Sequence, residues 1–260
     1  MIDVKPGNDR IREWLSRQGL EYVFVSVSGA HLYGFPSPDS DIDLRGAHLL
    51  PIDDMLGLHE PVETKTRTDI VEGVEVDFVS HDLRKFLQLL TKKNGYVLEQ
   101  VLSPHVVLES PLLGRLRDLA KGSMTKHLYH HYRGFAENQV RQVGQEDPPK
   151  AKSILYLYRV LLTGIHALEQ HEVEANLVSL SKLYPVDGLS DLVAAKTKEK
   201  APLTIDEARG WMERAQGLRE RLDRAFEKTT LPDKPPNLAD IDRFLVDARK
   251  GGWRRETLTT

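Results

Sequence analysis

A change in sequence texture at about residue 80 restricts the fold of this 260-residue chain more than any other feature. Before it, runs rich in β-branched and aromatic residues are separated by Gly and Pro, a pattern typical of strands. After it, apolar residues recur at the three- and four-residue spacing of amphipathic helices. We therefore predict an α+β chain, with a small mixed β-sheet followed by a helical bundle. The predicted strands cover residues 21–28, 41–49, 63–70 and 74–80, the last two joined as a hairpin around Glu72-Gly73.

Turn-forming residues mark breaks in the helical pattern at Gly122-Ser123, Asp147-Pro148-Pro149 and residues 232–236. The predicted helices cover residues 9–16, 82–90, 110–122, 124–145, 150–170, 176–183, 187–198, 204–228 and 238–250. We accordingly predict a sheet-containing domain over residues 1–110, a helical domain over 111–250 and a flexible tail over 251–260.

Composition narrows the class of protein. The chain has no cysteine, which excludes disulfides, thiolate metal sites and cysteine nucleophiles. No apolar run approaches the ~18 residues of a membrane span, and no signal-peptide pattern is present. The net charge of −3 argues against a basic coat for duplex binding, although basic residues outnumber acidic ones between residues 110 and 160. We expect a cytoplasmic protein with no membrane partner, and the sequence leaves its oligomeric state open.

Two aspartates follow a turn that is rich in Gly and Pro. Asp41 and Asp43 are two residues apart, and side chains at that spacing share one face of a strand. Two carboxylates on one face repel each other unless a cation lies between them. The glycine turn upstream offers backbone N–H groups that suit an anion such as phosphate. The pattern indicates nucleotide chemistry, whereas either aspartate alone would be an ordinary turn residue.

A third carboxylate, Asp77, lies in the run Val-Glu-Val-Asp-Phe-Val. Its apolar neighbours Val76 and Phe78 share one strand face, so Asp77 points to the opposite one. A carboxylate on a neighbouring strand, ~4.8 Å away, can join the first two around a pair of metal ions. Such a site suits in-line attack of a hydroxyl on a nucleoside triphosphate (NTP). The predicted catalytic and metal-binding residues are Asp41, Asp43 and Asp77, with two Mg²⁺ ions, or Mn²⁺, as cofactor.

The spacing of these motifs resembles that of a known family. Gly29-Ala30, then Pro38-Asp39-Ser40-Asp41-Ile42-Asp43-Leu44 and Asp77, resembles the signature of the DNA polymerase beta nucleotidyltransferase superfamily. Residues 76–86 and 93–102 are similar to its bacterial branch of RNA-repair-associated nucleotidyltransferases. The resemblance implies a palm-like nucleotidyltransferase domain, with Asp41 and Asp43 on both metal ions and Asp77 on the catalytic one. It also implies that the Gly29 and Ala30 backbone binds the β- and γ-phosphates.

One position departs from the family pattern. The residue after Gly29 is usually a serine whose hydroxyl binds a phosphate oxygen, and here it is Ala30. Losing one hydrogen bond to a charged group costs ~1.5–3 kcal/mol. The backbone donors survive the change, and Ser28 and Ser40 are the candidates to replace the missing hydroxyl.

The predicted helix over residues 150–170 adds three residues to the nucleotide site. Lys152, Tyr156 and Arg159 fall on one helix face at i, i+4 and i+7. We expect Lys152 to contact phosphate, Tyr156 to stack near the base and Arg159 to support charge. The alternative interpretation is a solvated stripe beside an apolar helix core.

Four further residues are assigned to the second substrate, the acceptor: Arg45, His131, Arg133 and Lys196. Arg45 directly follows the Asp-Ile-Asp-Leu run, and the family resemblance favours Lys196 over its neighbours in a lysine-rich stretch. Zinc binding by His127, His130 and His131 is the weaker interpretation, because no cysteine joins these histidines.

The sequence thus predicts a Mg²⁺-dependent nucleotidyltransferase that moves a nucleoside monophosphate from an NTP to a hydroxyl and releases pyrophosphate. The resemblance favours an RNA 3′ end, such as that of tRNA, as the acceptor in RNA repair or processing. The alternatives are nucleotidylation of a protein or small molecule, a catalytically silent NTP- or RNA-binding module, and an interaction scaffold.

Overall fold

The computed structural model describes residues 9–198 and 202–251. The chain divides into two compact units, and each is discontinuous in sequence. Unit 1 consists of Met1–Gly29, Asp41–Ser123 and Lys234–Thr260, and unit 2 of Ala30–Ser40 and Met124–Asp233. This division differs from the predicted domains over 1–110 and 111–250, which stay a prediction. The predicted tail, apart from Gly251, lies outside the described residues.

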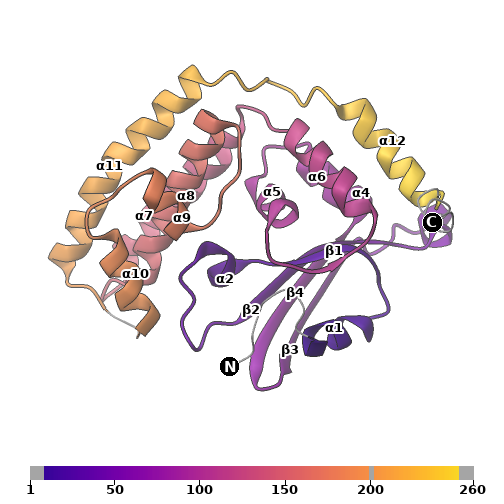
Figure 1. Cartoon of the computed structure of the whole chain (residues 1–260), viewed down its shortest axis with the longest axis horizontal. Coiled ribbons are helices and arrows are strands. Elements are labelled where there is room, and N and C mark those ends of the chain that lie inside the picture. The colour runs from indigo at the N-terminus through magenta and orange to yellow at the C-terminus, as the bar shows by residue number, and fades with distance from the viewer. Residues whose placement is uncertain (1–8, 199–201, 252–260) are drawn as a thin grey trace. The chain divides into compact units, whose positions relative to one another are not determined.

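Unit 1 is built on a five-stranded mixed sheet (Figure 1). The strands are β1 (Glu21–Val27), β2 (Ile42–Leu49), β3 (Thr64–Val71), β4 (Val74–Asp82) and β5 (Val106–Glu109). Their order is β3-β4-β2-β1-β5, with β2 parallel to β4 and the other neighbours antiparallel. The predicted α+β class is confirmed, and the sheet has one strand, β5, that the sequence analysis did not predict.

The predicted hairpin between β3 and β4 is also confirmed. Its two turn residues, Glu72 and Gly73, have φ angles of 53° and 81°. A two-residue turn with both φ angles positive follows the right-handed twist of the strands it joins. The hairpin puts β3 at the sheet edge and β4 beside β2, so the two aspartate-bearing strands are neighbours.

Side-chain alternation along β2 and β4 separates the core from the opposite face of the sheet. The residues that pack with helix α1 (Asp9–Ser16) in the core include Ile42, Leu44, Val76 and Phe78. Asp43 and Asp77 alternate with them and are partly exposed. The predicted orientation of Asp77, away from its apolar neighbours, is therefore confirmed.

The remaining helices of unit 1 are α3 (Ile52–Leu56), α4 (Leu83–Leu90), α5 (Gly95–Leu102), α6 (Leu112–Gly122) and α12 (Leu238–Arg249). Helix α4 begins at Asp82, whose side chain accepts a hydrogen bond from the Arg84 backbone. Both oxygens of the same carboxylate accept hydrogen bonds from Nη2 of Arg249, Oδ1 at 2.5 Å and Oδ2 at 2.7 Å. This buried ion pair attaches the C-terminal helix α12 to the sheet-containing unit.

Unit 2 is a helical bundle with α8 (Ala151–Gln170) at its centre (Figure 1). Around it pack α7 (Leu128–Gln145), α9 (Leu177–Leu183), α10 (Leu189–Lys198) and α11 (Ile205–Lys228). Helices α7 and α8 approach each other closely at Gly164. A Cβ atom added to this glycine would lie only 2.7 Å from the Cβ of Tyr132. Helix α11 begins with a capping box formed by Thr204 and Glu207.

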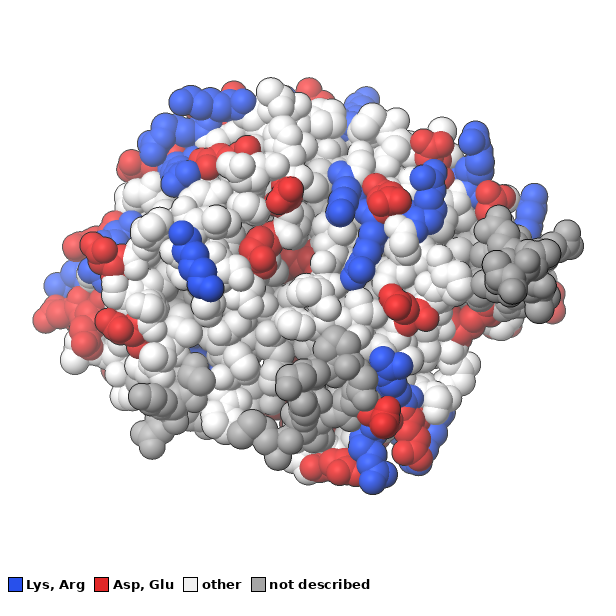
Figure 2. All heavy atoms as spheres, viewed as in Figure 1, with Lys and Arg blue, Asp and Glu red and all other residues white. Residues whose placement is uncertain are grey.

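On the face seen in Figure 2, Lys and Arg side chains are interspersed with those of Asp and Glu, in keeping with the net charge of −3. Within residues 9–198 and 202–251, no helix combines the length and apolarity that crossing a membrane requires.

Candidate functional site

The two strands that carry the predicted metal ligands bring two of them into register. Asp43 on β2 and Asp77 on β4 are direct partners in the parallel ladder. Adjacent strands lie ~4.8 Å apart, so the two side chains project side by side from one face. The structure therefore places Asp43 and Asp77 together, and it does so through strand pairing that the sequence analysis expected only in outline.

Arg45 lies between these two carboxylates. Its Nη2 donates to Oδ1 of Asp43 at 2.8 Å and to Oδ2 of Asp77 at 2.9 Å. Its Nη1 donates to the backbone carbonyls of Leu44 at 2.9 Å and Asp77 at 2.8 Å. The sequence analysis missed this arrangement. Side-chain alternation along the strand could have indicated that Arg45 lies beside Asp43, since residues 43 and 45 share a face.

The third predicted ligand, Asp41, directly precedes β2 and is exposed. Within the described part of the chain, no three His, Asp or Glu side chains are grouped as a metal site. The chemistry of the Asp43 and Asp77 pair nevertheless fits a cation, because both carboxylates already share one positive group. Metal binding by Asp41, Asp43 and Asp77 stays a prediction.

Gly29 lies against Asp43 and is needed there for two reasons. Its φ angle is 60°, in the left-handed region that residues with a Cβ rarely adopt. In addition, an added Cβ would lie 1.8 Å from Oδ2 of Asp43. The Ser28 backbone N–H donates to the Asp43 carbonyl at 2.8 Å, which fixes the two chain segments together.

A short helix, α2 (Gly29–Tyr33), follows β1 where the sequence predicted a turn. The Gly34 and Phe35 backbone N–H groups both donate to the Ala30 carbonyl, so the helix ends in a tight turn. Ala30 is buried. The expected contacts of Gly29 and Ala30 with phosphate stay a prediction.

Ser40 closes a turn in the following loop. Its hydroxyl accepts a hydrogen bond from the Ser37 backbone at 2.9 Å and lies 3.1 Å from the Ser37 hydroxyl. Its own N–H donates to the Ser37 carbonyl at 2.9 Å. Ser40 thus shapes residues 37–40, and its predicted role toward a nucleotide stays a prediction.

The three residues predicted on α8 have different surroundings. Lys152 is exposed, with Nζ 5.9 Å from the Tyr156 ring centroid. The Tyr156 ring meets Tyr33 and Phe35 edge-on at 5.7 and 5.4 Å. Arg159 is only 2% exposed, and its guanidinium lies 4.0 Å above the Tyr33 ring. Lys152 and Tyr156 are thus reachable from solvent, whereas Arg159 is a packed residue.

Lys196 is a buried lysine on α10, 8% exposed. Its Nζ donates to the Phe35 carbonyl at 2.8 Å and to the Ser37 hydroxyl at 3.0 Å. Burial lowers its pKa, and the neighbouring Lys152 lowers it further, while Asp39 opposes the shift. Lys196 therefore holds the loop that contains Ser37. Its role toward an acceptor stays a prediction.

The other two predicted acceptor residues lie on α7. Burial lowers the pKa of His131 to about 4, and the Arg159 charge contributes in the same direction. Arg133 forms ion pairs with Glu137 at 2.9 Å and Asp223 at 3.2 Å. The pair with Asp223 joins α7 to α11, whereas the pair with Glu137 lies within α7. The predicted acceptor contacts stay a prediction. His127, His130 and His131 are among the described residues, and they are not grouped as a metal site either.

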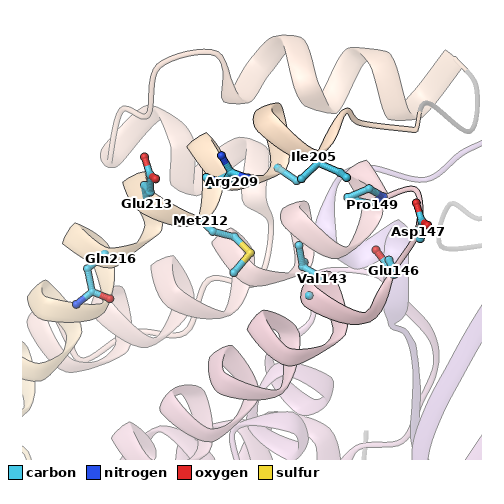
Figure 3. Close-up of a pocket in the computed structure, with 11 residues that line it drawn as sticks. Val143, Glu146, Asp147, Pro149, Ile205, Arg209, Met212, Glu213 and Gln216 are labelled. Carbon is cyan, nitrogen blue, oxygen red and sulfur yellow. The ribbon is translucent and has the colours of Figure 1, made fainter.

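Unit 2 contains a pocket of about 590 Å³ at the C-terminal end of α7 and the N-terminal half of α11 (Figure 3). Its lining combines the apolar residues Val143, Pro149, Ile205, Ala208 and Met212 with polar ones such as Glu146 and Arg209. None of the predicted site residues lines this pocket, so it is separate from the candidate site.

Comparison with known proteins shows the family. The profile of the RNA repair pathway DNA polymerase beta family matches residues 5–247. The chain belongs to that family. An uncharacterised protein of Methanocaldococcus jannaschii, MJ0002, is 32% identical over 223 residues, which cover 84% of this chain and 90% of the relative. This family is the one that the motif resemblance indicated.

Two further proteins show weaker similarity to this chain. The uncharacterised protein YcgL of Bacillus subtilis is 27% identical over 167 residues, which cover 63% of this chain and 62% of that protein. A solved nucleotidyltransferase-like protein from Exiguobacterium sibiricum is 10% identical, with a TM-score of 0.31, over 92% of this chain and 78% of its own. Family membership identifies this protein as a polymerase-beta-type nucleotidyltransferase associated with RNA repair.

Proposed function

We propose that this family member is a Mg²⁺-dependent nucleotidyltransferase that moves a nucleoside monophosphate from an NTP to the 3′ hydroxyl of an RNA. The observation that carries the proposal is the in-register pair Asp43 and Asp77, which share one cationic group at 2.8 and 2.9 Å. Paired carboxylates on a rigid sheet are what such a transfer requires for holding metal ions.

Different residues of the chain would bind the metal ions and the triphosphate. Asp43 and Asp77, joined by Asp41, would hold Mg²⁺. When bound, Mg²⁺ lowers the pKa of the attacking hydroxyl and neutralises charge on the leaving pyrophosphate. The backbone N–H groups of Gly29 and Ala30 would bind the triphosphate. The acceptor hydroxyl gives up its proton to water and its oxygen attacks the α-phosphorus. The bond from this phosphorus to the oxygen that bridges to the β-phosphorus breaks, and pyrophosphate leaves.

The predicted nucleotide contacts of α8 differ in how far their side chains are exposed. Lys152 is exposed, and its charge suits a phosphate oxygen. Tyr156 is partly exposed, so part of its ring is available for stacking on a base. Arg159 would act indirectly, because it is buried beneath Tyr33. Lys196 would act by holding the Ser37 turn, which precedes Asp41 in the chain.

A labelled-NTP assay tests this proposal. The full chain is incubated with each of the four labelled NTPs, Mg²⁺ and a panel of RNA, protein and aminoglycoside acceptors. We expect label on RNA, loss of transfer with a metal chelator, and a loss of about 10³-fold or more in Asp43→Asn and Asp77→Asn. Asp53→Asn, on the exposed helix α3, is the matched control and should retain activity.

Each alternative function gives a different result in this assay. Label on protein or aminoglycoside and never on RNA would refute the RNA acceptor. Nucleotide binding without transfer to any acceptor would indicate a silent binding module. Full activity of Asp43→Asn would refute the metal-dependent mechanism.

A further inference from the structure

The position between Asp43 and Asp77 is taken by a side chain of the protein itself. Arg45 Nη2 lies 2.8 Å from an Asp43 oxygen and 2.9 Å from an Asp77 oxygen, and the Arg45 side chain is only 20% exposed. We propose that Arg45 is an internal counter-ion, which must leave these carboxylates before a divalent cation can bind to both. This inference rests on the proposed function, which assigns the same two carboxylates to Mg²⁺.

The fold dictates that a cation is needed here. Parallel pairing of β2 and β4 sets two carboxylates side by side, and like charges that close destabilise the folded state. Arg45, two residues after Asp43, lies on the same strand face and is long enough to reach back. In the absence of metal, Arg45 therefore neutralises a charge cluster that the strand register creates.

The guanidinium is firmly held in this position. Besides the two carboxylates, the backbone carbonyls of Leu44 and Asp77 accept hydrogen bonds from its Nη1. A cation that binds both carboxylates therefore has to compete with these hydrogen bonds of Arg45.

Competition follows from the shared oxygens. One nitrogen of Arg45 engages one oxygen of each carboxylate, so a divalent cation held by both residues would draw on the same negative charge. A divalent ion bound to these carboxylates would also be repelled by a guanidinium within hydrogen-bond distance of them. Metal affinity is therefore lower than the two carboxylates alone would give.

Mn²⁺ binding to the full chain, measured without nucleotide by the electron paramagnetic resonance signal of the free ion, tests the proposal. We expect Arg45→Met to bind Mn²⁺ at least about tenfold more tightly than the unmodified protein. Arg45→Lys keeps the charge and should stay within about threefold of it. Equal or weaker binding by Arg45→Met would overturn the proposal, and so would a tenfold gain in Arg45→Lys.

Two further measurements keep the test decisive. Asp43→Asn should lose Mn²⁺ binding, and unchanged binding in that variant would refute the metal site itself, and thus the proposed function. If Arg45→Met does not fold, the Arg45 Nε–Hε resonance of the unmodified protein is followed instead, assigned by its absence in Arg45→Lys. Saturating Mg²⁺ should shift this resonance, and an unmoved resonance would overturn the displacement of Arg45.

Discussion

A Cβ atom on Gly29 would lie 1.8 Å from Oδ2 of Asp43, far inside van der Waals contact. Gly29→Ala must therefore push the Asp43 carboxylate aside, in addition to straining a backbone with a φ angle of 60°. We expect a loss of transfer activity of about 100-fold, because a displacement of about 1 Å at a reacting centre has that effect. Stability should fall by only about 1–2 kcal/mol, measured by urea unfolding.

Gly73→Ala is the matched control for this prediction. Gly73 also has a positive φ, 81°, but an added Cβ would meet nothing within 4 Å. This variant should lose similar stability and keep its activity. If both variants lose activity equally, backbone strain rather than the contact with Asp43 is responsible.

Ala30→Ser tests whether the missing hydroxyl weakens nucleotide binding. Restoring one hydrogen bond to a charged phosphate is worth about 1.5 kcal/mol, so the KM for the NTP should fall about tenfold. Steady-state kinetics of nucleotidyl transfer measures the change. Ala30→Gly, which adds no hydroxyl, should leave KM unimproved. An unchanged KM in Ala30→Ser would show that Ala30 does not contact the triphosphate.

The Asp82 and Arg249 ion pair should contribute strongly to the stability of unit 1. Asp82 is 0% exposed, so Arg249→Met leaves a buried carboxylate without its cation. We expect the free energy of unfolding to fall by about 3–5 kcal/mol in urea titrations. Arg243→Met, on the same helix, removes an ion pair at 3.9 Å whose arginine is 73% exposed, and should cost about 0–1 kcal/mol. Similar losses in both variants would contradict this account of how α12 is attached.

His48 should make the protein sensitive to acid. Burial lowers the pKa of this histidine from 6.5 to about 4, although the nearby Asp82 opposes the shift. The unfolded chain therefore takes up the proton first, and stability falls as pH decreases from about 6.5 to about 4. The difference corresponds to about 3 kcal/mol. His131, with its pKa also lowered to about 4, acts in the same direction.

Urea unfolding at several pH values between 4 and 7 measures this effect. His48→Asn keeps a polar group near the Ser80 hydroxyl, which lies 2.8 Å from Nδ1, and should flatten the pH dependence. His59 is exposed, so the control variant His59→Asn should retain the pH dependence of the unmodified protein. An unchanged slope in His48→Asn would show that other groups cause the acid sensitivity.

The sequence by itself determined the class of fold, the family and most helices and strands. Local signals were sufficient for these features, because period-two and period-3.6 patterns are written into neighbouring residues. The hairpin at Glu72-Gly73 and the orientation of Asp77 away from Phe78 are examples that the structure confirms. The motif spacing around Asp41 and Asp43 identified the family for the same reason, since it needs no knowledge of distant contacts.

Only the tertiary structure decided how distant residues combine. The parallel pairing of β2 with β4 puts Asp43 opposite Asp77, 34 positions later in the numbering, and places Arg45 between them. Likewise, α12 belongs to the sheet-containing unit because Arg249 pairs with the buried Asp82. Strand order and long-range ion pairs depend on the packing of the whole chain. Strand alternation could place Arg45 on the same face as Asp43, but it could not specify that the guanidinium also reaches Asp77.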